Sequence, residues 1–117
     1  MKFNTSFPIY LQVVTTIKRD LVTGKMKAGD KLPSGRDLAA TYQINPNTAA
    51  RVYSELEQQG ITFTKRGLGT FVTEDDSLIT RLKDEMAEEI LTRFLEEMNE
   101  LGISSKEAIR MAEERLT

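Results

Sequence analysis

The 117-residue sequence contains neither cysteine nor histidine. Without cysteine it can form no disulfide and offers no thiol nucleophile, which fits the reducing cytoplasm. Without histidine it lacks the commonest general base, and the two absences together remove the usual ligands of a structural zinc site. Only carboxylates, tyrosine and lysine are left for an enzyme to use. We therefore expect a cytoplasmic protein that is not an enzyme and that has no catalytic residues, no metal site and no cofactor.

Long apolar runs are also missing. No stretch approaches the roughly 18 apolar residues of a membrane-spanning helix, and residues 1–6 contain no apolar signal region. We expect no membrane partner. With 39% hydrophobic and 29% charged residues, the composition is that of a globular chain. The length suits one small domain with an appendage.

The two ends of the chain differ in charge. Residues 1–73 contain ten Lys/Arg and five Asp/Glu, a net charge of +5, whereas residues 74–117 contain six and thirteen, a net charge of −7. This asymmetry predicts a basic domain that binds phosphate and an acidic appendage that DNA would repel. A solvated acidic helix beside an ordinary domain would give the same imbalance, so charge alone leaves both interpretations open.

The spacing of apolar residues predicts three helices in the basic part, followed by two short strands. The first helix opens at Pro8 and stops at Gly24. The second is capped by Ser34, and the third starts at Asn45-Pro46 and ends before Gly60. Alternating residues at 61–64 and 70–72 form a hairpin with its tip at 65–69. The sequence thus predicts a mostly α fold with a small β-hairpin, a winged helix-turn-helix over residues 1–73.

Residues 74–117 are predicted to form a two-helix tail. Its long amphipathic helix is broken by Gly102, and Ser104 caps a last helix. The apolar row of the long helix has more surface than a small domain can cover, and self-association is the usual way to bury it. The candidate dimerisation residues are Leu78, Leu82, Met86, Ile90, Leu91, Phe94, Met98 and Leu101. The alternative is a scaffold module whose amphipathic tail binds another protein.

The third helix has two distinct faces on a helical wheel. Ala49, Val52, Tyr53 and Leu56 cluster on one side, and Asn47, Arg51, Ser54 and Gln58 fall opposite. An ordinary surface helix would carry carboxylates on the second side. Amides there are able to pair with adenine, and an arginine with guanine or phosphate. We interpret this side as a DNA-reading face, although Asn45 and Asn47 would also serve simply to start the helix.

The hairpin tip supports this interpretation. Lys65 and Arg66 lie beside Gly67 and Gly69, and glycine lets the backbone approach a ligand closely. A basic tip of this kind suits a phosphate backbone or a minor groove. It is not a nucleotide-binding loop, because no helix follows the second glycine.

These motifs together resemble the GntR family of bacterial regulators over about residues 7–73. The resemblance rests on Pro8-Ile9-Tyr10-x-Gln12, Gly29-Asp30-x-Leu32-Pro33-Ser34-x-Arg36-x-Leu38-Ala39, Asn45-Pro46-Asn47-Thr48, Tyr53-x-x-Leu56-Glu57-x-x-Gly60-Ile61 and Gly67-x-Gly69-Thr70-Phe71-Val72. The short tail is similar to that of the YtrA-type branch. The resemblance implies dimeric repression, often of genes for ABC-type transporters, with DNA contacts by Arg36, the Asn45–Thr48 turn and the wing glycines. The sequence departs from the family pattern at Gly35, where a glutamate is usual, and at Ala50, where many relatives have a polar or basic residue.

The expected partners are double-stranded DNA, bound at a roughly palindromic operator, and a second copy of the chain. A small-molecule effector between subunits stays open, and no residue pattern points to its chemistry. The candidate DNA-binding residues are Ser34, Arg36, Asn45, Pro46, Asn47, Thr48, Arg51, Ser54, Lys65, Arg66, Gly67 and Gly69.

Overall fold

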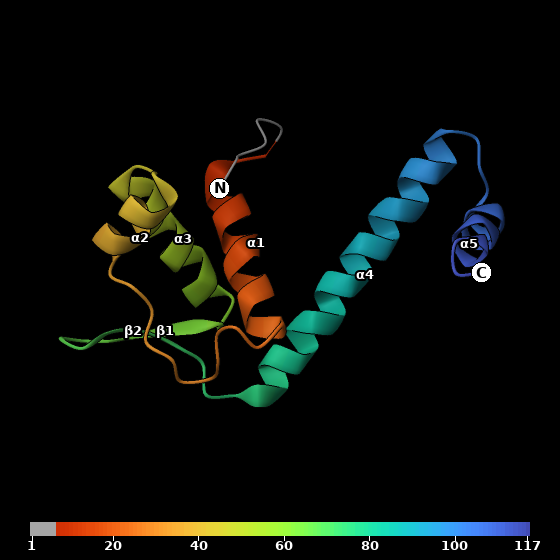
Figure 1. The fold of residues 1–117 in the computed structure, drawn as a ribbon. Helices are drawn as coiled ribbons and strands as arrows, with labels where there is room; N and C mark the ends of the chain where they lie inside the picture. The colour runs from red at the N-terminus through yellow and green to blue at the C-terminus, as the bar shows by residue number, and fades with distance from the viewer. Residues whose placement is uncertain (1–6) are drawn as a thin grey trace. The chain divides into compact units, whose positions relative to one another are not determined.

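A computed structural model describes residues 7–117 (Figure 1); the predicted lack of a signal region at 1–6 lies outside the described residues. The elements are α1 (Ile9–Val22), α2 (Gly35–Tyr42), α3 (Pro46–Gln58), β1 (Thr62–Lys65), β2 (Gly69–Val72), α4 (Asp76–Glu100) and α5 (Ser105–Glu114). Three helices followed by a hairpin confirm the predicted winged helix-turn-helix, and two helices follow it. The chain divides into an N-terminal unit, up to Leu82, and a C-terminal unit, Lys83–Thr117. This division lies inside α4, whereas the boundary predicted after residue 73 stays a prediction.

The core of the N-terminal unit forms where α3 packs against α1 and α2. Its side chains come from the apolar positions that the helical spacing predicts, because burial of each removes apolar surface from water, worth about 1.5–3 kcal/mol for a large side chain. Val52 and Leu56 of α3 have no exposed surface, and Val13 of α1 has none either. The hairpin adds Val72, also fully buried, beneath these helices.

Side-chain caps fix where α2 and α3 begin. The Ser34 Oγ accepts a hydrogen bond from the Asp37 backbone N–H at 3.1 Å, and the Asn45 Oδ1 accepts one from the Asn47 N–H at 2.7 Å. Between the helices, Gln43 adopts a left-handed backbone conformation with φ of 53°. It is the single non-glycine residue with positive φ in the part of the chain that the structure describes. The predicted caps at Ser34 and Asn45 are therefore confirmed.

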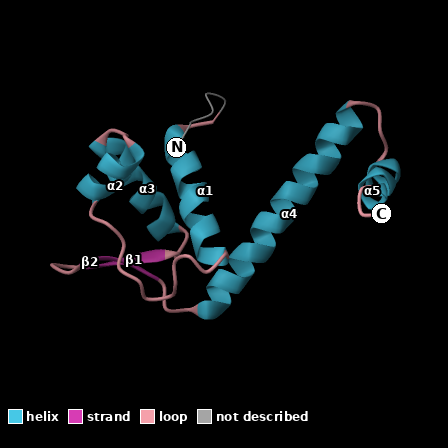
Figure 2. Ribbon diagram, viewed as in Figure 1, coloured by secondary structure: helices cyan, strands magenta, loops and turns pink. Residues whose placement is uncertain are grey.

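The segment before α2 pairs with the free edge of β2 and so extends the hairpin (Figure 2). β1 and β2 pair antiparallel, with Phe63 opposite Phe71 and Lys65 opposite Gly69. On the other side of β2, Lys31 forms a bridge with Phe71, and the Leu32 N–H donates to the Thr70 carbonyl at 2.8 Å. The bridge ties the loop that leads into α2 to the base of the hairpin.

The helices of the tail begin at side-chain caps. Asp75 Oδ1 accepts hydrogen bonds from the Ser77 and Leu78 N–H groups at 3.0 and 3.3 Å, and the Ser77 hydroxyl bond holds the pKa of this carboxyl below its usual value. Ser104 Oγ accepts from the Glu107 N–H at 3.1 Å, as the sequence predicts. Ala108 of α5 is fully buried. None of the helices within residues 7–117 has the length and hydropathy to cross a membrane.

Candidate nucleic-acid interface

The outward face of α3 presents the side chains that the helical wheel assigns to it. Asn47, Arg51 and Ser54 are exposed, whereas Ala49 and Val52 on the opposite side are completely buried. Ala50 is exposed as well, and its small side chain leaves room beside the helix. The predicted division of the helix into an inner and an outer face is confirmed, and the contact of this face with DNA stays a prediction.

The first turn of α3 offers hydrogen-bond donors. Asn45 uses its carboxamide oxygen for the cap, so its Nδ2 group keeps both N–H donors. Pro46 occupies the first helical position, and Asn47 and Thr48 follow it. A helix N-terminus carries a partial positive charge, which favours an anionic ligand such as a phosphate.

The start of α2 offers a second set of donors. The Ser34 hydroxyl accepts the cap bond and can still donate its own proton, and Arg36 is exposed two residues later. Gly35 has open space where a Cβ would lie, with nothing within 4 Å, and its φ is not in the left-handed region. No contact requires glycine here, and nothing in the structure explains the departure from the usual glutamate.

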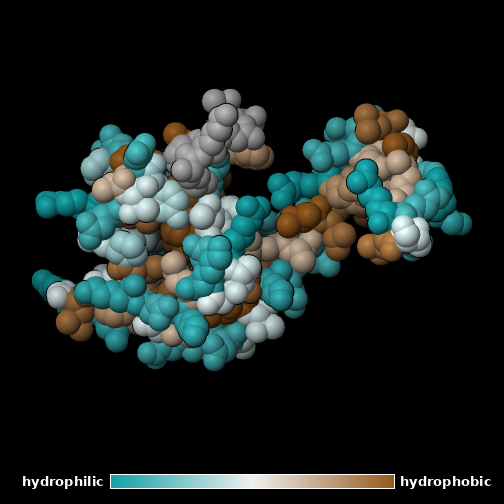
Figure 3. All heavy atoms as spheres, in the orientation of Figure 1, coloured by the Kyte–Doolittle hydropathy of each residue, from teal (hydrophilic) through white to brown (hydrophobic). Residues whose placement is uncertain are grey.

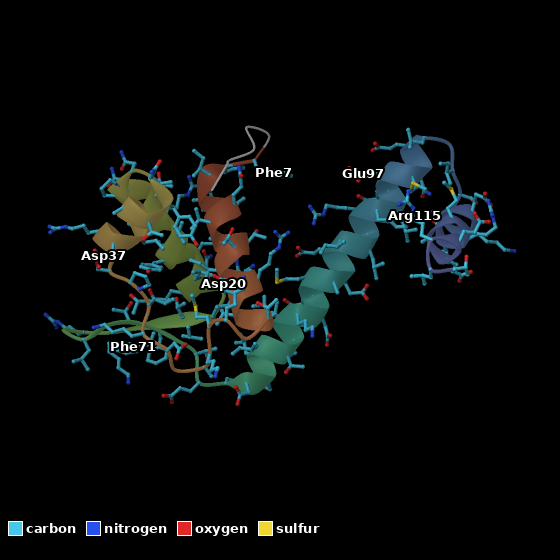
Figure 4. All side chains as sticks on the ribbon, viewed as in Figure 1. Phe7, Asp20, Asp37, Phe71, Glu97 and Arg115 are labelled. Carbon is cyan, nitrogen blue, oxygen red and sulfur yellow. The ribbon has the colours of Figure 1, made fainter. Side chains whose placement is uncertain are left out.

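Tyr53 connects the middle of α3 to the segment just before α2. Its hydroxyl donates to the Pro33 carbonyl, so the inner flank of α3 is joined to the residue just before the Ser34 cap. Burial of the ring, with smaller effects from Tyr42 and Asp37, raises the pKa of Tyr53 to about 12. Asp37 is labelled on α2 in Figure 4. The bond keeps the middle of α3 in a fixed relation to the start of α2.

The hairpin tip is held by an aromatic pair. The rings of Phe63 and Phe71 stack with centroids 5.9 Å apart, and Lys65 Nζ lies 5.5 and 4.9 Å from them. This contact orients the Lys65 ammonium and keeps it exposed, and Arg66 is exposed beside it. Leu68, between the two tip glycines, is 61% exposed.

Both tip glycines have conformations that other residues rarely adopt. Gly67 has φ of 80° and Gly69 of 121°. A Cβ on Gly69 would lie only 3.0 Å from Lys31 Cε, so a side chain here would push against the lysine stem. The two glycines are therefore required for the shape of the tip, whether or not they also touch DNA.

Arg51 has a partner that the sequence did not predict. Its guanidinium carbon lies 3.9 Å from the centroid of the Tyr10 ring on α1. In the sequence Tyr10 stands out as part of the family motif, and the structure leaves it half-buried. No local pattern joins two residues that are so far apart in the chain.

We call Arg36, Arg51, Lys65 and Arg66 the four candidate cations. Within residues 7–117 the salt bridges all lie in α5, where Arg110 pairs with Glu107 and Glu114. The four candidate cations thus have no carboxylate within 4.0 Å and keep their charge for an external anion. The same residues include no group of three acidic side chains that could hold a metal ion.

The residues of the predicted dimerisation row lie in different environments. Leu82 is buried within the N-terminal unit, and the Leu78 Cδ1 lies near Gly60 of the same unit. Met86, Phe94 and Met98 are half-buried. Hydrophobic side chains of the tail that remain at the surface (Figure 3) are Ile90, Leu91, Leu101, Ile109, Met111 and Leu116, each at least 39% exposed. The exposed apolar surface is thus concentrated beyond Leu82.

Comparison with known proteins identifies several relatives. Residues 9–72 match the family described as bacterial regulatory proteins, gntR family. The chain is 44% identical to the HTH-type transcriptional regulator YhcF of Bacillus subtilis, over 92% of this chain and 89% of that protein. It is 40% identical to the HTH-type transcriptional repressor YtrA of the same organism, over 86% and 73%. A GntR family transcriptional regulator from Listeria monocytogenes has a similar structure, with a TM-score of 0.86 and 41% identity over 96% of this chain and 98% of that one.

Proposed function

Because the chain belongs to the gntR family of bacterial regulatory proteins, we propose that it represses transcription as a homodimer bound to a roughly palindromic operator. The observation that carries the proposal is the position of the four candidate cations, all exposed, on α2, α3 and the hairpin tip. Arg36 lies in the first turn of α2, and the starts of α2 and α3 are both capped; helix starts favour phosphate for the same electrostatic reason.

Repression is the direction that the relatives support. The relative named YtrA is a transcriptional repressor, and it shares both the DNA-binding region and most of the tail with this chain. A repressor needs only to occupy its operator. Nothing beyond the winged helix-turn-helix and a dimerising tail is required for this role.

Dimerisation follows from the apolar surface of the C-terminal unit. Ile90 and Leu91 on α4 are about half exposed, and Leu101 and Leu116 are more than 70% exposed. A second copy would bury these side chains in a symmetric pair. A two-fold dimer presents two copies of α3 to two half-sites whose centres lie about one helical turn of DNA apart. This geometry is the reason to expect an approximately palindromic operator.

A binding titration tests the proposal. The full chain is titrated into a fluorescein-labelled duplex taken from upstream of its own gene and into a mixed-sequence duplex of equal length. We expect tighter binding to the first duplex by a factor of about 10³ or more, and a steep loss of affinity with salt as counterions are released. Equal, weak binding to both would contradict an operator, and no binding to either would favour the scaffold module. Reporter transcription from the upstream region should fall when the protein is present, and a rise would contradict repression.

A further inference from the structure

Arg51 is the single Lys or Arg of α3, and it is exposed on the outward face of that helix. It is also held in place, because its guanidinium lies over the Tyr10 ring at 3.9 Å from the centroid. An exposed arginine normally samples many rotamers. This one is restrained by an aromatic ring that belongs to a different helix.

The stacked contact leaves the hydrogen-bonding capacity of Arg51 intact. A ring attracts the flat face of a guanidinium, whereas the five N–H donors point outward in the guanidinium plane. No carboxylate within residues 7–117 lies within 4.0 Å of Arg51. The stack therefore fixes the direction of a planar set of donors without using any of them. A guanidinium in this state matches two oxygens of a phosphate group.

The position of Tyr10 indicates which part of the DNA this arginine meets. The ring is on α1, so the guanidinium leans from α3 toward the neighbouring helix. Asn47 and Ser54 are exposed on the outward face of α3, which we expect to enter the major groove. A side chain at the flank of a helix lying in the groove is close to the groove edge, where the phosphates are.

We propose that Tyr10 is a positioning residue for Arg51 and that the stacked pair holds Arg51 against a backbone phosphate of the bound DNA. This inference rests on the proposed function, since it assumes that α3 faces DNA. The energetic basis is that the stack pre-orders a flexible side chain, so that less conformational entropy is lost on binding. A purely structural stack would join α1 to α3 with no effect on DNA affinity beyond its effect on folding.

The test is a double-mutant cycle on DNA affinity, with the full chain and the two duplexes described above. Arg51→Ala should weaken binding to both duplexes about tenfold, the loss expected for one hydrogen-bonded charge, and should lower the salt slope by about 1. Tyr10→Leu should weaken binding about three- to tenfold, again on both duplexes. The double variant should bind as Arg51→Ala does, because the ring acts only through the arginine.

Variants that keep a ring control for the fold. Tyr10→Phe and Tyr10→Trp preserve the aromatic face, so both should bind within about twofold of the parent. Arg51→Lys keeps the charge and loses the planar fork, so it should bind about three- to tenfold more weakly with an unchanged salt slope. Arg51 is exposed, so this last variant tests the proposal even if Tyr10→Leu fails to fold. Thermal unfolding checks that each protein is folded at the titration temperature.

The inference would be overturned if Arg51→Lys or a folded Tyr10→Leu bound with the affinity of the parent. It would also be overturned if the fold-loss of the double variant were the product of the two single fold-losses. A large loss of affinity for Tyr10→Phe would overturn it as well. A loss confined to the upstream duplex would overturn the phosphate assignment in favour of a base contact. Failure of the proposed function is distinguishable, because then the parent itself binds neither duplex. If the parent binds and Arg36→Ala weakens it while the Arg51 and Tyr10 variants do not, only the present inference fails.

Discussion

The two units of the chain differ in the extent of their buried core and in the sign of their charge. The N-terminal unit has a packed core, with Val13, Val52 and Leu56 at zero exposure, and its cations have no ion-pair partners within the described residues. The C-terminal unit pairs Arg110 with two glutamates and leaves side chains such as Leu101 and Leu116 largely exposed. The first unit has the larger buried core and carries the candidate DNA-binding cations. The second unit is acidic and leaves apolar side chains exposed, so the two units differ in the kind of partner that each would bind.

The largest effect should come from the core of the first unit. Leu56→Ala removes a fully buried side chain from α3, and we expect the free energy of unfolding to fall by about 2–5 kcal/mol. Gln58→Ala, at an exposed position of the same helix, is the control and should change it by no more than about 0.5 kcal/mol. Chemical denaturation measures both. Equal effects of the two substitutions would mean that α3 is not packed as described.

In the second unit, the exposed apolar surface should control self-association. Ile90 is 51% exposed, so Ile90→Glu should leave the fold of one chain intact and place a charge where a second copy would bury an isoleucine. We expect dissociation to monomers at micromolar concentration, since an unpaired buried charge costs several kcal/mol. Thr92→Glu changes a nearby exposed residue and should not affect assembly. Sedimentation velocity distinguishes the two, and an Ile90→Glu protein that still dimerises would place the dimer interface elsewhere.

The unpaired cations of the first unit should matter for DNA and not for stability. Arg36→Ala should weaken binding to the upstream duplex by about 1–3 kcal/mol, the range for an arginine that pairs with a base, while the free energy of unfolding stays within about 0.5 kcal/mol of the parent. Arg93→Ala, an exposed arginine of the acidic unit, should leave DNA affinity unchanged. A mobility-shift titration measures both, and equal losses would show that DNA binding depends on net charge alone.

The smallest effect concerns pH and is confined to the first unit. The pKa of Tyr53 is about 12 in the folded chain and about 10 when unfolded. The folded state therefore holds this proton more tightly, and the stabilisation is complete below pH 10 and is lost as pH rises toward 12. Tyr53→Phe should lower stability by about 0.5–1.5 kcal/mol at neutral pH and remove this part of the alkaline decline. Denaturation at pH 8 to 11 tests it; an unchanged alkaline decline in the variant would refute the assignment.

Local signals explain why the sequence predicted so much of the fold. Ser34, Asn45 and Ser104 cap helices through bonds that span only two or three residues. The outer face of α3 follows equally from periodicity within one helix. Contacts between distant segments had no such signal, so the sequence did not predict the Tyr10–Arg51 stack or the Lys31 bridge. Leu82, whose spacing matches the dimerisation row, is buried in its own unit, because periodicity shows that a side chain is buried but not what buries it.

Gln43 bears on the dynamics of the helix-turn-helix. A left-handed conformation costs a non-glycine residue about 1–2 kcal/mol, and it is held here by bonds from the Gln43 and Ile44 N–H groups to the Ala40 and Ala39 carbonyls at 3.3 and 2.9 Å. Opening the last turn of α2 would release that strain, so the turn and the end of α2 should exchange their amide hydrogens together, before the buried residues of α3 do. The turn that leads into α3 is thus maintained by two local hydrogen bonds against the conformational preference of Gln43, and a glycine at this position would make the joint less strained and the opening rarer.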